Sequence, residues 1–226
     1  MREPAVPSAR GGRFIAFEGI DGSGKSSTMA RVAAALKAEG RDVVTTREET
    51  DTERGAWVRK AVAEGWDPIA TTLLFVADRA AHAAEINAWL AAGKTVLCDR
   101  YVHSTYAYQS VTLADRLQDP SGFLRRLHEP WCPMPDHVLL FRADPARCLD
   151  RVRKRGQATA YEKVEFLHRV QEAYLAEARS DGRIAVLDAE RDIADVGVDA
   201  IAQVKAWLAH PGVAPKSRQR VPSPSA

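Results

Sequence analysis

The sequence predicts an α/β fold in which a five-stranded parallel sheet is covered by helices on both faces. Short apolar runs alternate along the chain with longer segments of helical pattern. Crossovers of this length return the chain in the same direction, so the strands pair in parallel. The expected strands are residues 14–17, 42–46, 95–98, 137–141 and 184–187.

Helix formers dominate the segments between these runs. Residues 29–36, directly after the first strand, are rich in alanine and other good helix formers. We therefore expect a helix to begin just before them. The other expected helices include residues 68–92, 145–155, 161–179 and 193–208.

Length and composition indicate one domain. The chain has 226 residues, of which 46% are hydrophobic and 27% charged, so it can bury one substantial core. We assign the domain to residues 13–210. Residues 1–12 and 211–226 are poor in large apolar side chains, and we expect them to be flexible tails. The second tail is basic and rich in Pro and Ser, and a solvated tail is favoured over an anion-binding one.

Charge and cysteine content exclude several classes of partner. The net charge is +2, from 32 basic and 30 acidic residues, which creates no overall field to recruit nucleic acid or an anionic membrane. Cys98, Cys132 and Cys148 are odd in number and widely spaced, which favours buried free thiols over a disulfide or a zinc site. The first ten residues lack an apolar signal segment, and we expect a soluble, cytoplasmic protein.

The segment after the first strand is a candidate phosphate-binding loop (P-loop). Residues 19–26 read GIDGSGKS and fit G-x-x-x-x-G-K-[ST] between an expected strand and an expected helix. Glycines let backbone N–H groups converge on phosphates, Lys25 adds a charge, and the Ser26 hydroxyl can reach Mg²⁺. The alternative is a plain glycine turn. The candidate nucleotide-binding residues are Gly19, Ile20, Asp21, Gly22, Ser23, Gly24, Lys25, Ser26 and Ser27.

An acidic residue ends the third expected strand. Asp99 follows residues 95–98, and a carboxylate at this end of a parallel strand can hold Mg²⁺ together with Ser26. Arg100 is next and can meet a second phosphoryl group, although an ordinary surface pair is the alternative. ATPases that hydrolyse ATP usually have a second acidic residue here, which orients water. The cationic Arg100 instead favours transfer of the phosphoryl group to a bound anionic acceptor.

Two further groups of residues suggest a nucleotide pocket. On the helix from residue 68, spacings of three, four and seven put an aromatic ring and a guanidinium on one face, which could stack a base and grip its phosphate. A polar and aromatic patch follows Asp99. Taken singly, the helix residues more often belong to a core or to a solvated surface, and any amphipathic helix can carry the residues of the patch. They are Phe75, Asp78, Arg79 and His82 on the helix, and Tyr101, Ser104, Thr105, Tyr106, Tyr108 and Gln109 in the patch.

Taken together, these motifs resemble those of thymidylate kinases. The segments at 17–26, 46–48, 74–79, 99–101 and 104–109 occur in the family's order and spacing, and the resemblance spans about residues 13–210. It implies a P-loop NTPase three-layer fold with a short lid at about residues 153–161. It also implies transfer of the γ-phosphoryl group of ATP to dTMP with Mg²⁺, in a homodimer.

The resemblance implies a role for each matching residue. Asp21 would accept from the 3′-hydroxyl of the deoxyribose, and Arg47, Arg79 and Arg100 would surround the acceptor phosphate. A second set would bind the nucleoside. In that set Phe75 stacks on thymine, Thr105 and Gln109 bond the base edge, and Tyr108 crowds the 2′ position.

Two departures from the family pattern affect these expectations. In most family members a proline follows the Arg-Glu pair after the second strand, but here Glu49 follows Arg47 and Glu48. Residues 157–160 lack the arginine that bacterial-type members carry in the lid. We expect Lys25, Arg100, Arg153 and Arg155 to act in catalysis, with Arg155 also near adenine. Two alternatives stay open: a kinase of a modified pyrimidine deoxynucleotide, and a nucleotide-binding regulator with weakened catalysis.

Overall fold

The computed structural model describes residues 11–154 and 163–209, and within them it has one five-stranded sheet. All strand pairs are parallel, in the order β2-β3-β1-β4-β5. Each strand starts within one residue of its expected position, so the predicted fold class is confirmed. The strands are β1 Arg13–Glu18, β2 Val43–Arg47, β3 Thr95–Asp99, β4 His137–Arg142 and β5 Ile184–Asp188.

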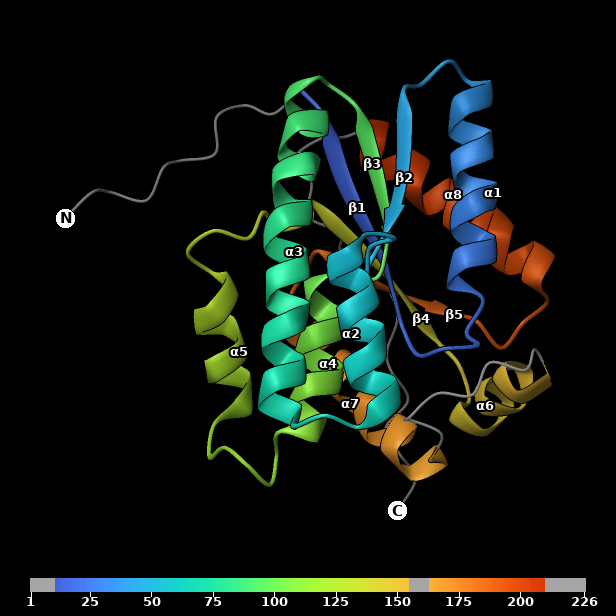
Figure 1. Cartoon of the computed structure of the whole chain (residues 1–226). Coiled ribbons are helices and arrows are strands. Elements are labelled where there is room, and N and C mark those ends of the chain that lie inside the picture. Colours follow the sequence, from blue (N-terminus) through green and yellow to red (C-terminus); the bar gives the residue numbers. More distant parts are fainter. Residues whose placement is uncertain (1–10, 155–162, 210–226) are drawn as a thin grey trace.

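Helices cover both faces of the sheet (Figure 1). α1 and α8 lie together on one face, and α3, α4 and α7 lie on the other, with α2 and α5 packed outside them. The helices of the described residues are α1 Lys25–Ala38, α2 Glu53–Glu64, α3 Pro68–Ala91, α4 Val102–Thr112, α5 Pro120–His128, α6 Pro145–Lys154, α7 Val164–Ser180 and α8 Ile193–Ala209.

Three of these helices, α2, α4 and α5, were not among the expected ones, although the caps of α2 and α5 are visible in the sequence. Thr52 accepts from the Gly55 N–H at the start of α2. At the start of α5, Asp119 accepts from the Gly122 N–H at 2.8 Å, and Pro120 takes the first helical position. Both are standard helix-start signals. α5 carries His128, which contacts Arg79 on α3.

The central strands have no exposed face. Phe14, Ile15, Ala16 and Phe17 of β1 are all fully buried. A parallel sheet covered on both sides produces such continuous apolar strands. The carboxyl ends of β1, β2 and β3 therefore meet at one edge of the sheet, where ligands bind in folds of this kind.

Several expectations fall on residues 1–10, 155–162 and 210–226, outside the described part of the chain. The tails, the domain limits and the lid therefore remain predictions. The three cysteines are buried free thiols, as expected. Across residues 11–154 and 163–209, every helix is too short or too polar to span a bilayer.

Candidate functional site

The loop after β1 packs tightly against α6 and ends at the start of α1. Gly24 is the N-cap of α1 and has a left-handed φ of 90°. Gly22 has a φ of 83°, and a Cβ there would collide with the carbonyl oxygen of Cys148 on α6. Only glycine fits that approach. The loop therefore has the geometry required of a P-loop, with its backbone at a helix N-terminus.

Lys25 lies beneath this loop. Its side chain is buried, and Nζ donates to the Ile20 carbonyl at 3.0 Å. Burial lowers the pKa of Lys25, and the neighbouring Arg100 lowers it further. The ammonium group is thus held inside the loop by a neutral carbonyl, which leaves it able to interact with an anion.

Ser26 and Asp99 meet at the carboxyl edge of the sheet. The Ser26 hydroxyl donates to Asp99 Oδ2, although the two residues lie on α1 and β3. β3 is the immediate neighbour of β1, and Asp99 pairs in register with Phe17. The sheet topology therefore brings together the two oxygen ligands that the sequence suggested for Mg²⁺.

Arg100 extends from β3 toward the P-loop. Its backbone has a left-handed φ of 67°, which is uncommon for a residue other than glycine. Its NH2 lies 2.7 Å from Asp21 Oδ1. Partial burial raises the pKa of Asp21, but Arg100 and Lys25 outweigh it and lower that pKa to about 2. Asp21 is therefore ionised at neutral pH.

A buried carboxylate, Glu18, organises the residues behind Arg100. It accepts from the Tyr101 N–H at 2.8 Å, the Ser104 hydroxyl at 2.6 Å and the Tyr174 hydroxyl at 3.0 Å. Ser104 in turn accepts from Arg100 at 3.1 Å. Burial raises the pKa of Glu18, and these hydrogen bonds oppose the rise. Glu18 was not among the site residues expected from the sequence, although a charge at the end of an apolar strand is a visible signal.

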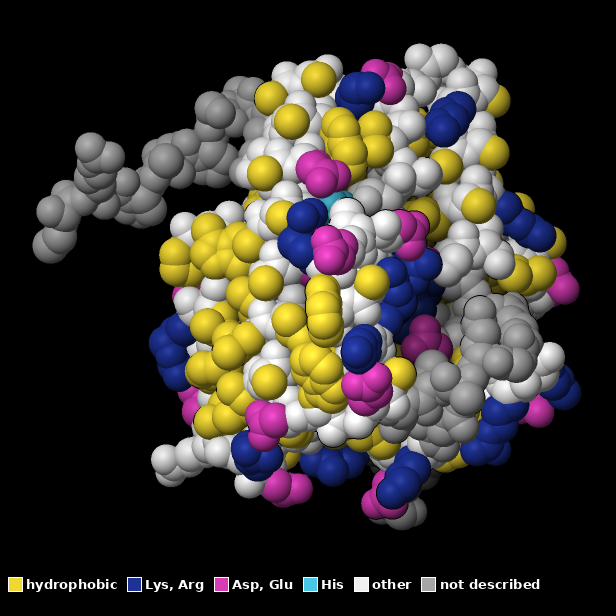
Figure 2. Space-filling model, viewed as in Figure 1, with side chains coloured by type: hydrophobic (Ala, Val, Ile, Leu, Met, Phe, Trp, Pro, Cys, Tyr) yellow, Lys and Arg dark blue, Asp and Glu magenta, His cyan; other side chains and the backbone are white. Residues whose placement is uncertain are grey.

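A pocket opens beside the P-loop, between α3 and α4. It has about 440 Å³ of empty space, part of it open to solvent. Figure 2 shows dark blue side chains gathered in a hollow on this face of the molecule. Seven of the eight expected substrate-binding residues line the pocket. The lining residues are Asp21, Glu48, Glu49, Phe75, Arg79, Arg100, Tyr101, Ser104, Thr105, Tyr108 and Gln109.

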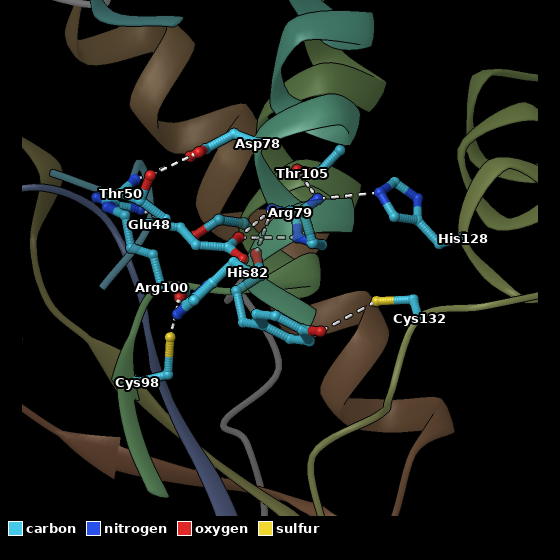
Figure 3. Close-up of polar contacts among 12 residues, drawn as sticks. Glu48, Thr50, Asp78, Arg79, His82, Cys98, Arg100, Thr105, His128 and Cys132 are labelled. Atoms are coloured by element: carbon cyan, nitrogen blue, oxygen red, sulfur yellow. Dashed lines mark hydrogen bonds and ion pairs between the residues drawn. The ribbon is translucent and has the colours of Figure 1, made fainter. Parts of the chain in front are cut away.

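Arg79 lines this pocket and contacts several polar neighbours (Figure 3). Its side chain is only 2% exposed and pairs with Glu48, with 2.6 Å between NH2 and Oε2. NH1 donates to the Thr105 hydroxyl at 2.9 Å and contacts His128 Nε2 at 2.9 Å. Burial disfavours its charge, but Glu48 more than compensates and raises the pKa of Arg79. Neither Glu48 nor His128 was among the site residues expected from the sequence.

The other two residues of the expected helix face point elsewhere. Asp78 accepts from the Thr50 N–H at 2.8 Å and from its hydroxyl at 2.6 Å. His82 lies between Glu48 and Thr46, at 3.0 Å and 2.7 Å. Neither Asp78 nor His82 lines the pocket. They fix the segment after β2, so only half of that face serves the pocket directly.

Arg47 is the expected substrate residue that the pocket lacks. It ends β2 as an exposed side chain, in register with Asp99. Its charge helps to lower the pKa of Asp21, so it lies near the P-loop side of the site. Glu49, which replaces the family's usual proline, does line the pocket.

Of the basic residues at the end of α6, Arg151 is the one that contacts the P-loop. Its NH1 donates to the Gly22 carbonyl at 3.2 Å. Lys154 pairs with Asp150 at 2.7 Å instead, and Arg153 is exposed. Arg155, expected in catalysis and near adenine, lies outside the described residues.

Comparisons with known proteins agree with this geometry. The family model described as thymidylate kinase matches residues 17–200. A probable thymidylate kinase of Methanosarcina mazei is 41% identical over 87% of this chain and 97% of its own length. One of Methanococcoides burtonii is 39% identical over 85% and 96%. One of Pyrobaculum calidifontis is 36% identical over 87% and 97%.

Proposed function

This chain belongs to the thymidylate kinase family and is a dTMP kinase, and on that premise we propose how its residues divide the work of phosphoryl transfer. The reaction moves the γ-phosphoryl group of ATP onto the phosphate of dTMP. Such transfers depend on positioning and charge far more than on covalent steps by the protein. The ion pair of Asp21 and Arg100 carries the assignment, because it joins the P-loop to the pocket.

At the donor end, the P-loop backbone and Lys25 bind the phosphates of ATP. Ser26 and Asp99 hold Mg²⁺, and their direct contact supports this because a hydroxyl and a carboxylate are the hard oxygen ligands that this ion prefers. When bound, the ion neutralises charge on the transferring phosphoryl group. Lys25 adds a second positive charge from the buried side of the loop.

At the acceptor end, Arg100 binds the phosphate of dTMP. The phosphate takes the place of Asp21 on the guanidinium, and Asp21 is then free to accept from the 3′-hydroxyl. Arg47 supports the same phosphate from the end of β2. Charge-assisted bonds of this kind align the acceptor oxygen with the donor phosphate.

The base lies farther from the P-loop. Phe75 stacks on thymine, Thr105 and Gln109 bond its edge, and Tyr108 crowds the 2′ position. The resemblance assigned Arg79 to the acceptor phosphate, but its pairing with Glu48 and its bond to Thr105 support a role at the base instead. Asp21 is partly exposed and can leave Arg100 when a phosphate binds, whereas Glu48 and Arg79 are both buried, so the paired Arg79 adds less attraction for the acceptor phosphate.

A lid cation stabilises the charge that develops during transfer. Of the nearby basic residues, Arg151 among them, the sequence favoured Arg153 and Arg155, yet the contact with Gly22 supports Arg151 among the described residues. We therefore rank Arg151 ahead of Arg153 for this role. Arg155 remains a candidate near adenine.

A homodimer and a cytoplasmic location complete the proposal. Trp57 and Trp66 are 46% and 37% exposed, and Leu73 on α3 is 47% exposed. Figure 2 shows yellow side chains clustered over the region of α2, α3 and α5. A second copy would cover this apolar area. A monomeric mass by light scattering at micromolar concentration would contradict the dimer.

The free thiols favour a reducing compartment, which supports a cytoplasmic location.

A coupled assay of ADP release tests the assignment. We expect dTMP to be preferred over dUMP, and strongly over ribonucleotides and purine monophosphates, because fixed polar groups reject ligands that leave them unpaired. The panel includes 5-substituted deoxyuridine monophosphates, because Glu49 lines the pocket and a modified pyrimidine remains an alternative acceptor.

Lys25→Ala should remain folded and lose at least about a hundredfold in turnover. The exposed Lys37→Ala on the same helix is the control. Equal turnover of dTMP and dGMP would overturn the pocket assignment.

A further inference from the structure

Each nitrogen of the Arg79 guanidinium contacts a protein group. A guanidinium has five N–H groups in a rigid fork. Nε donates to Glu48 at 2.8 Å, and NH2 contacts Glu48 at 2.6 Å and the Tyr101 carbonyl at 3.3 Å. NH1 bonds Thr105 and His128, each at 2.9 Å. Arg79 lines the pocket, and the neighbours that hold it fix the direction of its N–H groups.

His128 is the neighbour that comes from farthest away, at the end of α5 (Figure 3). Its Nδ1 lies 2.7 Å from the Leu124 carbonyl, which can only accept, so Nδ1 carries the hydrogen. Nε2 then has a free lone pair facing Arg79. Burial, and next the charge of Arg79, lower the pKa of His128 to about 4, so the ring is neutral at physiological pH.

The ring of His128 has a fixed position. The side chain is fully buried. It packs edge-on against Tyr106 of α4, with 5.8 Å between ring centroids, and against Trp131 at 5.5 Å. These contacts hold Nε2 in place relative to α3 and α4. Displacement of the acceptor would leave one N–H of a buried guanidinium without a partner, which is costly.

The consequence reaches the pocket through Thr105. Its Oγ1 accepts from Arg79, and within the described residues this is its one hydrogen bond. The hydroxyl hydrogen therefore remains available for a ligand. Thr105 and Gln109 are one turn apart on α4, and both line the pocket. A donated hydrogen suits the carbonyl oxygen of thymine, whereas cytosine presents an amino group at the same ring position.

We propose that His128 is a positioning residue that fixes Arg79 and thereby the donor direction of Thr105, so that the pocket selects a pyrimidine with a carbonyl edge over one with an amino edge. The inference rests on the proposed assignment of this pocket to the base. α5 contributes no residue to the pocket lining. Through His128, this helix would nevertheless determine acceptor selectivity.

Two substitutions separate the contacts of His128. His128→Asn keeps a donor near Nδ1 for Leu124 and removes the acceptor at Nε2, whereas His128→Gln keeps an acceptor near Nε2. Loss of a bond to a buried charged donor corresponds to roughly tenfold or more. We expect His128→Asn to lower the ratio of kcat/KM for dTMP over dCMP about tenfold and to raise the KM for dTMP. His128→Gln should stay within about threefold of the unmodified protein, and the KM for ATP should change in neither.

The controls distinguish positioning from packing. His168→Asn, at an exposed position of α7, should change nothing. A dTMP/dCMP ratio that stays unchanged in His128→Asn, with only the melting temperature lowered, overturns the proposal. His128→Leu, which keeps apolar bulk but no acceptor, gives the same test if His128→Asn fails to fold. Nitrogen-resolved NMR of the unmodified protein should show the Nδ1-protonated ring, and the opposite tautomer would also overturn it.

Thr105→Val separates this proposal from the pocket assignment. If Thr105→Val lowers the dTMP/dCMP ratio and His128→Asn does not, the role of His128 alone is wrong. If Thr105→Val leaves the ratio unchanged, the base does not lie at Thr105 and the pocket assignment fails, and the role of His128 fails with it.

Discussion

Arg100 and Asp21 form an ion pair, with 2.7 Å between NH2 and Oδ1, that links the end of β3 to the P-loop. One residue belongs to the proposed acceptor site and the other to the nucleotide loop. In the proposed assignment, the pair therefore joins the two substrate sites before either ligand binds. It also keeps a strong cation in place without a ligand.

This pair predicts a specific acid dependence of stability. The folded pKa of Asp21 is about 2, below the ordinary value of 3.8, so its stabilisation is fully present above about pH 4 and is lost as the pH falls toward 2. The free energy of unfolding should therefore differ most between the unmodified protein and Asp21→Asn above pH 4. Urea unfolding across this range measures it, with exposed Asp115→Asn as control. A difference that stays constant from pH 5 to pH 2 would contradict the pair's role.

The contact between Ser26 and Asp99 predicts a magnesium dependence. Asp99→Asn removes the charged ligand, and we expect the Mg²⁺ concentration for half-maximal activity to rise at least about tenfold. Ser26→Ala should shift it in the same direction by less, because a hydroxyl is the weaker ligand. Asp115→Asn again serves as the control. An unchanged Mg²⁺ requirement in Asp99→Asn would place the ion elsewhere.

Arg151 and Arg153 offer a matched pair on one helix. Arg151→Ala should lower kcat at least about tenfold, toward the thousandfold seen when a transition-state arginine is removed, and should change the KM for dTMP little. Arg153→Ala, whose side chain is exposed, should stay within about threefold of the unmodified protein. The reverse order would restore the assignment of Arg153 that the sequence suggested.

Tyr108 predicts how the pocket excludes ribonucleotides. The ring is buried, and its hydroxyl lies 3.4 Å from Arg100 NH2. Tyr108→Phe keeps the bulk of the ring and should retain the preference for dTMP over its ribonucleotide analogue. Tyr108→Ala removes the bulk, and we expect the preference to fall at least about tenfold. The ratio of kcat/KM values measures this, and equal preference in the two variants would remove Tyr108 from sugar selection.

Much of the fold followed from the sequence because its signals are local. Apolar runs located all five strands within a residue at their starts. The P-loop pattern depends on glycines that adopt positive φ angles, and this requirement arises within the loop itself. Asp99 and Ser26 could be brought together in advance because the ends of parallel strands share one edge.

Contacts between distant segments were decided only by the tertiary structure. The sequence marked Arg79 by its spacing on a helix, but Glu48 and His128, which hold it, come from the end of β2 and from α5. Likewise, Arg151 and Arg153 are two residues apart, and packing of α6 against Gly22 selects between them. Helical spacing fixes which residues share a face. It does not fix which neighbour a buried charge meets, because a buried charge requires a partner that only the packing of the whole chain can supply.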